Sequence, residues 1–243
     1  MDIHKPKAAH SWREFLIEIG TIICGILIAL GLEQAVDWSR TQRELSETRE
    51  ALRKEITANT RSALLFAAQE NCLLTWSDRA VAWAKGGARP EPPVLFEILL
   101  SSTVWDASRA GVALRMPTDE RLKLAGYYNL IDQHQKLSRQ LDDAVVRVNR
   151  YAPLQRLDTA QAKSLIEELN AMKPLVAGHV VEDRFAILAA AGLGVGAKGL
   201  VPEVAAPASR ICGPLGGVAS FEVPEDAQAT YDWYTNILRG RAP

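Results

Sequence analysis

The sequence has no excess of charge of either sign, because its 28 lysines and arginines are balanced by 29 aspartates and glutamates. A dedicated nucleic-acid-binding protein usually carries a clear basic excess, so we predict no nucleic-acid partner. Apolar residues make up 48% of the chain and charged residues 23%, which is ordinary for a folded protein. The 243 residues are enough for one large domain or two small ones.

Motifs of enzymatic chemistry are also missing. The sequence has no HExxH zinc motif, no GxSxG nucleophile elbow and no phosphate-binding P-loop. Gly194–Gly199 fits the letters GxGxxG, but a predicted helix precedes it and Pro202 and Pro207 follow it. A dinucleotide fingerprint instead joins a strand to a helix. We therefore interpret this segment as a loop and predict no catalytic residue, no cofactor and no enzymatic activity.

Histidine is scarce, and the predicted body contains only His134 and His179. His179 is close in sequence to Glu182 and Asp183, which are residue types that bind metals. Neither histidine begins a known metal-binding pattern, and His134 shares a helical face with apolar residues. We predict no metal site and interpret His134 as a hydrogen-bonded, half-buried residue.

The sequence does contain one long apolar run near its start, Phe15–Leu32, with a single charge at Glu18. Trp12 and Trp38 lie on either side of this run, 26 positions apart, which is about 39 Å in a helix. That length approaches the thickness of a bilayer with its headgroup zones, where tryptophan prefers to lie. The pattern predicts a transmembrane anchor with Trp12, Arg13 and Trp38 at the membrane interfaces.

Two other interpretations of the apolar run are a buried core helix and a cleaved signal peptide. A core helix does not need flanking tryptophans and basic residues. Ala29-Leu30-Gly31 loosely resembles a signal-peptidase site. However, the helical pattern continues past Asp37 without a break, as in an uncleaved signal-anchor.

The basic residues around the run predict its orientation. Arg13 abuts the run, whereas the first basic residue on the other side is Arg40. The positive-inside rule then places the N-terminus in the cytoplasm. We predict a short cytoplasmic tail at 1–14, a transmembrane anchor at 15–37 in the lipid bilayer, and a helical extracytoplasmic domain at 38–243.

Small residues recur every four positions along the anchor, at Thr21, Gly25 and Ala29, and Glu18 adjoins this row. Such a row lets two membrane helices approach closely, and a carboxyl group can hydrogen-bond across the contact. One interpretation is an interface with another membrane protein or a second copy of the chain. The other is chance, since small residues are common in membrane helices and Glu18 can reach the headgroups.

The region from Val36 to Lys85 has no proline or glycine. Its apolar or small residues recur with an eleven-residue period, which puts one stripe on a nearly straight helix; they are Leu45, Leu52, Ile56, Ala63, Ala67 and Leu74. The stripe predicts a long amphipathic helix that packs on the body. A coiled coil with a second copy is the alternative, although alanines at stripe positions weaken it.

Proline, glycine and capping residues divide the rest into further helices. We predict a loop at 86–93 and helices at 94–108, 118–151, 159–173 and 180–191, with a bend at Pro174 and Gly178. A Gly/Pro-rich irregular segment follows at 192–224, and then a last helix. The predicted fold class is mainly α: a transmembrane helix that continues into a long amphipathic helix, packed in a helical bundle.

Three cysteines are present, and Cys24 lies in the anchor. If the body faces an oxidising compartment, Cys72 and Cys212 are expected to pair as a disulfide. The alternative is two buried free thiols that act as small apolar residues.

The anchor text WREFLIEIGTIICGILIALGLEQAVDW resembles an uncharacterised family of bacterial single-pass membrane proteins. Trp105–Leu114 and Tyr127-Tyr128 also resemble the central motif of that family. The resemblance covers about the first 130 residues. It implies an inner-membrane location, but the family has no established activity to carry over, so Trp105 and Gly111 are interpreted as packing and turn residues.

These observations favour a membrane-anchored, non-enzymatic helical module at the bacterial inner membrane that binds other proteins or a second copy of itself. An extracytoplasmic sensor-like domain that binds a small molecule is the alternative. The predicted tail before the anchor is too short for a signalling domain, so such a sensor would act through a partner.

Overall fold

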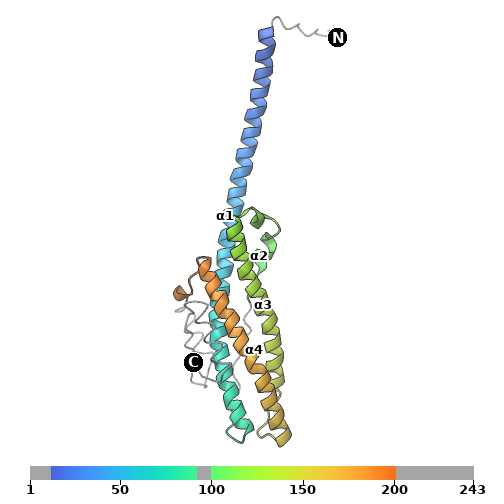
Figure 1. Cartoon of the computed structure of the whole chain (residues 1–243), viewed down its shortest axis with the longest axis vertical. Coiled ribbons are helices and arrows are strands. Elements are labelled where there is room, and N and C mark those ends of the chain that lie inside the picture. The colour runs from blue at the N-terminus through green and yellow to red at the C-terminus, as the bar shows by residue number, and fades with distance from the viewer. Residues whose placement is uncertain (1–11, 92–99, 201–243) are drawn as a thin grey trace, which may run out of the picture. The chain divides into compact units, whose positions relative to one another are not determined.

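The computed structural model describes residues 12–91 and 100–200, and within them the chain is mainly α-helical (Figure 1). The elements in chain order are α1 (Trp12–Ala84), α2 (Thr103–Ser108), the 3-10 turn η1 (Val112–Arg115), α3 (Thr118–Asn149), α4 (Thr159–Gly192) and the 3-10 turn η2 (Ala197–Gly199). The predicted last helix and most of the predicted Gly/Pro-rich segment lie outside the described residues.

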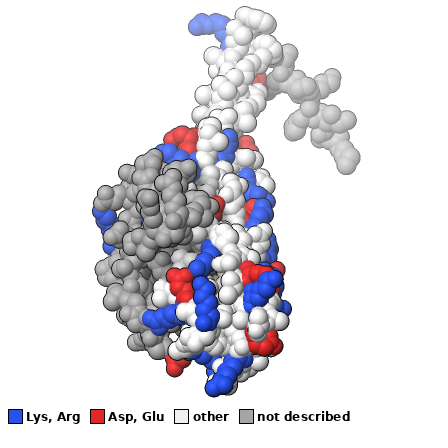
Figure 2. Space-filling view, turned by 60° about the horizontal axis from the view of Figure 1, so that its bottom comes forward, with Lys and Arg blue, Asp and Glu red and all other residues white. Residues whose placement is uncertain are grey.

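Contacts divide the chain into two units, Met1–Glu47 and Thr48–Pro243. In the first unit, every residue from Trp12 to Arg40 is exposed. This stretch of α1 is long and apolar enough, by length and composition, to cross a membrane. Figure 2 shows the charged side chains gathered on the helical body, in mixed groups of both signs.

The second unit is a helical bundle in which the later part of α1 packs with α3 and α4 (Figure 1). All three helices contribute to one apolar core, because each turns a row of apolar side chains inward. The fully or nearly buried members of this core are Cys72, Leu73, Trp76, Ala80, Trp83, Leu141, Ala144, Val148, Tyr151, Leu165, Leu169, Met172 and Val176. The predicted fold class is therefore confirmed.

The predicted stripe on α1 is buried within the chain's own fold. Leu52, Ile56, Ala63 and Ala67 are all fully or nearly buried, whereas Leu74 is half-buried. The opposite face carries exposed charged residues, such as Arg53 and Lys54 in the second unit. The stripe from Leu52 to Ala67 is therefore a packing surface, and it is not available for a coiled coil with a second copy.

Local signals explain where the helices of the second unit begin and end. Gly86 has a φ of +97°, a left-handed conformation that favours glycine and ends α1. At the start of α4, Asp158 and Gln161 form a complete capping box, in which each side chain accepts a hydrogen bond from the other's backbone N–H. The N-cap of α3 is Pro117, so the threonine that follows is the first helical residue and makes no side-chain cap.

The bend predicted at Pro174 does not interrupt the helix, because α4 runs from Thr159 to Gly192 as one element. Pro174 cannot donate to the carbonyl of Asn170 one turn earlier. Both residues are exposed, so this carbonyl lies on the solvent side of the helix. Met172 and Val176 are fully buried on the other side, and their packing holds the helix together across the proline.

Two predictions concern glycines. Gly111, interpreted from the sequence as a turn residue, lies in the turn after Arg109, the C-cap of α2, and is the N-cap of η1. Gly194, the first residue of the GxGxxG text, has a φ of +84° and follows Leu193, the C-cap of α4. A helix rather than a strand precedes this segment, as predicted, so it lacks the context of a dinucleotide fingerprint.

Candidate functional site

A buried group of two histidines and one aspartate lies between α3 and α4. His134 comes from α3, and His179 and Asp183 come from α4, where they are one helical turn apart. His134 Nδ1 lies 3.0 Å from Asp183 Oδ1, and His179 Nδ1 lies 3.7 Å from Asp183 Oδ2. All three side chains are at most 2% exposed. We call these three residues the His–Asp cluster.

Neighbouring side chains fix the two imidazole rings. The ring centroids of His134 and His179 are 4.0 Å apart, and Phe66 on α1 packs against both at 4.8 and 5.2 Å. His179 Nε2 lies 2.7 Å from Ser138 Oγ on α3. This hydrogen bond holds the ring so that Nδ1 is directed toward Asp183.

The cluster contains polar atoms that are buried without a hydrogen-bond partner among the described residues. These atoms are both ring nitrogens of His134 and both carboxylate oxygens of Asp183. The 3.0 Å approach of His134 to Asp183 is therefore an ion-pair distance without the geometry of a hydrogen bond. Buried polar groups are nearly always satisfied, so this concentration at one point requires a physical reason.

Glu182 lies beside the His–Asp cluster and is half-buried. Burial raises the pKa of its carboxyl group, and the charge of Asp183 adds to that rise, while His134 and His179 act in the opposite direction. Its Oε2 atom is also buried without a hydrogen-bond partner among the described residues.

A second polar group in the bundle is fully satisfied. The buried carboxylate of Glu55 on α1 accepts hydrogen bonds from the hydroxyls of Tyr128 and Ser101, at 2.6 and 2.8 Å, and from the backbone N–H of Val104 at 3.0 Å. Trp105 stacks on Tyr128 with ring centroids 5.3 Å apart. This network ties the segment before α2 to α1 and α3, which is a structural role.

Burial raises the pKa of Tyr128 well above its ordinary value, and the hydrogen bond and charge of Glu55 raise it further. Burial likewise raises the pKa of Tyr127. Both phenols therefore remain protonated donors at neutral pH, and Tyr128 donates to Glu55. Trp105, interpreted from the sequence as a packing residue, is buried against this pair.

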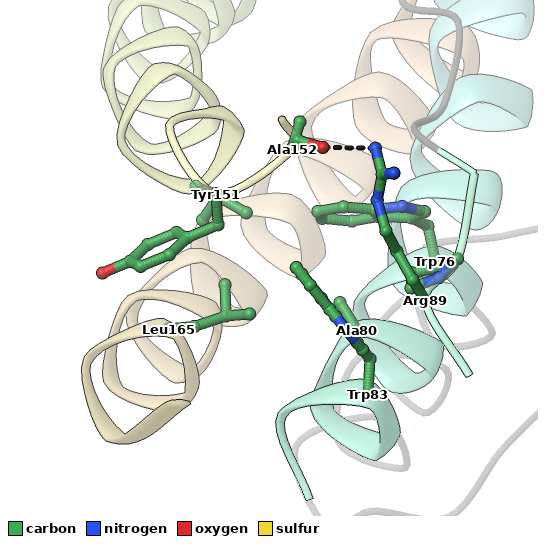
Figure 3. A pocket seen from close by; sticks show the side chains of 9 residues that line it. Trp76, Ala80, Trp83, Arg89, Tyr151, Ala152 and Leu165 are labelled. Atoms are coloured by element: carbon green, nitrogen blue, oxygen red, sulfur yellow. Dashed lines mark hydrogen bonds between the residues drawn. The ribbon is translucent and has the colours of Figure 1, made fainter. Parts of the chain in front are cut away.

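A small cavity lies at another point of the bundle, lined by aromatic residues (Figure 3). Trp76, Ala80 and Trp83 line it from α1, and Leu165 lines it from α4. The Arg89 side chain reaches across its mouth and donates a hydrogen bond to the carbonyl of Ala152. The cavity has a volume of about 10 Å³, which is room for about one water molecule.

The anchor residues predicted from the sequence all lie on α1 and are all exposed. Trp12 and Trp38 are 72% and 68% exposed, and Arg13 is exposed as well. In the small-residue row, Thr21 donates a hydrogen bond to the carbonyl of Ile17 at 2.8 Å, which satisfies its hydroxyl within the helix. A Cβ added at Gly25 would meet nothing within 4 Å.

Glu18 and Ala29, the other members of that row, are exposed too. The described residues of the chain therefore leave the whole row uncovered, and its role as an interface stays a prediction. Cys24 is a free, exposed cysteine on the same segment. Cys72 is buried in the core of the bundle and is disulfide-bonded. Its predicted partner, Cys212, lies outside the described residues, so the identity of the partner stays a prediction.

No protein-family model, curated protein or solved structure matches this chain.

His134, predicted from the sequence to be half-buried and hydrogen-bonded, is fully buried, and its ring nitrogens have no hydrogen-bond partner among the described residues. The sequence prediction did not bring His134 and His179 together. The sequence did contain a signal that could have predicted this contact. The buried residues of α3 and α4 form pairs whose members lie at equal distances along the sequence from the turn between the two helices. Val148 and Leu165, and likewise Leu141 and Met172, are equally far from the midpoint of that turn; so are His134 and His179.

Proposed function

We propose that this chain is a membrane-anchored, non-enzymatic helical module at the bacterial inner membrane, which acts as an accessory or binds other membrane proteins. The observation that carries the proposal is the complete exposure of an apolar helical segment, none of whose span-length window is buried. An exposed apolar surface of this size in water is costly and prone to aggregation, whereas a bilayer covers it.

The flanking residues support a defined depth and orientation. Trp12 and Trp38 project from the helix at the two ends of the apolar segment, where the headgroup zones of a bilayer would lie. Arg13 at one end favours a cytoplasmic N-terminus and a periplasmic body. The resemblance of the anchor text to bacterial single-pass membrane proteins agrees with this topology.

The helical body offers a scaffold rather than a substrate pocket in the part that the structure describes. The cavity beside Trp76 holds about one water molecule, so it gives no support to the alternative of a small-molecule sensor. Charged residues of both signs alternate on the body, and several are paired. A partner is therefore expected to contact the anchor row or the polar surface of the body.

Thiol labelling tests the topology. Ala88 is exposed in the loop after α1, and Ala88→Cys in a Cys24→Ala background should react with a membrane-impermeant thiol reagent in intact spheroplasts. The matched control, Ala8→Cys in the predicted tail, should react only after lysis. The opposite pattern would contradict the orientation. Release of the wild-type protein by alkaline carbonate would contradict the membrane anchor itself.

A further inference from the structure

We propose that His134, His179 and Asp183 form a closed binding site for a divalent transition-metal ion such as Zn²⁺. The inference is independent of the proposed membrane function. It rests on the geometry of the His–Asp cluster and on the unsatisfied polar atoms in it. Each residue offers one ligand atom, and these atoms all lie within 4.8 Å of one another.

The donor set suits such an ion. Two imidazoles and a carboxylate are ligands that Zn²⁺ and related first-row metals accept, whereas Ca²⁺ and Mg²⁺ prefer oxygen ligands alone. In a tetrahedral zinc site with bonds of about 2.0–2.1 Å, neighbouring ligand atoms are about 3.4 Å apart. The shortest approaches to Asp183 are 3.0 Å, from His134 Nδ1 to Oδ1, and 3.7 Å, from His179 Nδ1 to Oδ2. One ligand atom from each residue lies within 4.8 Å of the other two, so small side-chain shifts would bring the set to that spacing.

The surroundings also match those of a metal site. A metal-bound histidine usually donates its second N–H to a nearby acceptor, which fixes the ring. Ser138 Oγ is 2.7 Å from His179 Nε2 and plays that part, so Nδ1 remains as the ligand atom. Helical bundles commonly build metal sites from inward side chains on facing helices, as α3 and α4 do here.

A metal would account for some of the buried polar atoms that have no hydrogen-bond partner among the described residues. One cation would supply a partner for one ring nitrogen of His134 and one oxygen of Asp183, and it would balance the buried carboxylate. Because the three ligands are at most 2% exposed, a substrate in solution does not reach the ion. We therefore expect the ion to join α3 to α4, with these three residues as three of the four ligands of a tetrahedral site.

The test uses the full-length protein in detergent, carrying a purification tag without histidine. After removal of bound metal with a chelator, the wild type should take up about one Zn²⁺ or Co²⁺ per chain. Co²⁺ should give the visible absorption of a tetrahedral complex, and Zn²⁺ should raise the midpoint of thermal unfolding. Failure to bind either ion would overturn the proposal and would identify the cluster as a metal-free polar contact.

Three variants locate the site. His179→Gln and Asp183→Asn each remove one ligand and should weaken Co²⁺ binding by at least tenfold, the lower limit seen even for outer-shell changes. Glu167→Gln is the matched control, because Glu167 is an exposed carboxylate on the same helix, and it should bind as the wild type does. Equal binding by Asp183→Asn and wild type would overturn the assignment.

If the ligand variants fail to fold, a further variant still tests metal binding by the His–Asp cluster. Ser138→Ala keeps all three ligands and removes only the hydrogen bond to His179. It should keep the helical circular dichroism of the wild type and weaken Co²⁺ binding about tenfold. Unchanged affinity in Ser138→Ala, together with a thermal midpoint that does not respond to Zn²⁺, would overturn the proposal.

Discussion

The two units of the chain place similar apolar side chains in opposite environments. In the first unit, Ile26 is 54% exposed and Leu27 is 64% exposed, whereas in the second unit Ile131 and Leu169 are 1% and 0% exposed. The second unit supplies protein neighbours for these apolar residues, whereas every residue from Trp12 to Arg40 in the first unit is exposed. The comparison shows that apolar content alone does not identify a core, since the apolar residues of this exposed stretch gain no stability from burial against the described chain.

The largest expected effect concerns the predicted disulfide between two cysteines of the second unit. If the body is periplasmic, Cys72 and Cys212 should form a disulfide that closes a loop of about 140 residues and stabilises the fold by about 3–5 kcal/mol. Reduction should lower the free energy of unfolding by that amount, measured by urea denaturation. The comparison would break if both thiols of the oxidised, unfolded Cys24→Ala protein reacted freely with an alkylating reagent.

Truncation of one large side chain in each unit measures the contrast directly. Leu169→Ala removes a fully buried side chain from the core and should lower the free energy of unfolding by about 2–5 kcal/mol. Ile26→Ala, in the exposed segment, should change the unfolding of the body by less than about 0.5 kcal/mol. Fluorescence of the buried tryptophans during urea denaturation reports on the body alone. Equal effects of the two changes would refute the comparison.

The polar network of the body should give a smaller effect. Tyr128→Phe removes one donor from the buried carboxylate of Glu55 and should destabilise the body by about 1.5–3 kcal/mol at pH 7. The same urea denaturation measures it. Thr57→Ala is a control, because its hydroxyl bonds only the carbonyl of Arg53 within α1, and it should have little effect.

The raised pKa of Tyr128 also predicts a pH dependence. The folded protein holds this proton above the pH at which the unfolded chain releases it, near pH 10. Unfolding therefore releases a proton in alkaline solution, so the stability present below pH 10 is lost as the pH rises further. Tyr128→Phe should flatten this loss. A wild type whose stability does not change between pH 9 and about pH 11 would contradict the assignment.

The smallest effect on folding is expected in the anchor. A Cβ added at Gly25 meets nothing within 4 Å among the described residues, so Gly25→Ile should leave the stability of the body unchanged. If the small-residue row packs on another membrane helix, the same change should reduce crosslinking in native membranes, because it keeps the backbones apart. Ile26→Leu, about 100° away on the helix, is the control. Equal crosslinking yields for wild type and Gly25→Ile would mean that the row is incidental.

Periodicity in the sequence was sufficient to predict α3 and the long helix α1 with its buried stripe, whereas the helix predicted at 94–108 is α-helical only from Thr103 among its described residues. Leu52, Ile56 and Ala63 recur with a spacing that only a helical face satisfies, and Asp158 and Gln161 form a capping signal that depends on four consecutive residues. Such features are local, so a single sequence contains all the information that they require.

Features that depend on packing between helices were predicted less well. The sequence predicted two helices with a bend at Pro174 between them. Instead α4 is one continuous helix, because the buried residues on either side of Pro174 hold it together. The His–Asp cluster joins residues about 45 positions apart, and only the register of α3 against α4 brings them together. The exposed or buried state of a histidine depends on that register and not on its immediate neighbours in sequence.

The position of the cluster has a consequence for how α3 and α4 recognise each other. Tyr127, His134, Leu141 and Val148 recur every seven residues on α3, and Leu165, Met172, His179 and Ala186 do so on α4. A slide of one heptad would match apolar layers nearly as well but would move the two histidines apart by about 10 Å. Asp183 would then face apolar side chains, at a large cost in free energy. The polar layer thus gives this pair of helices a single alignment, as a buried asparagine does in a coiled coil.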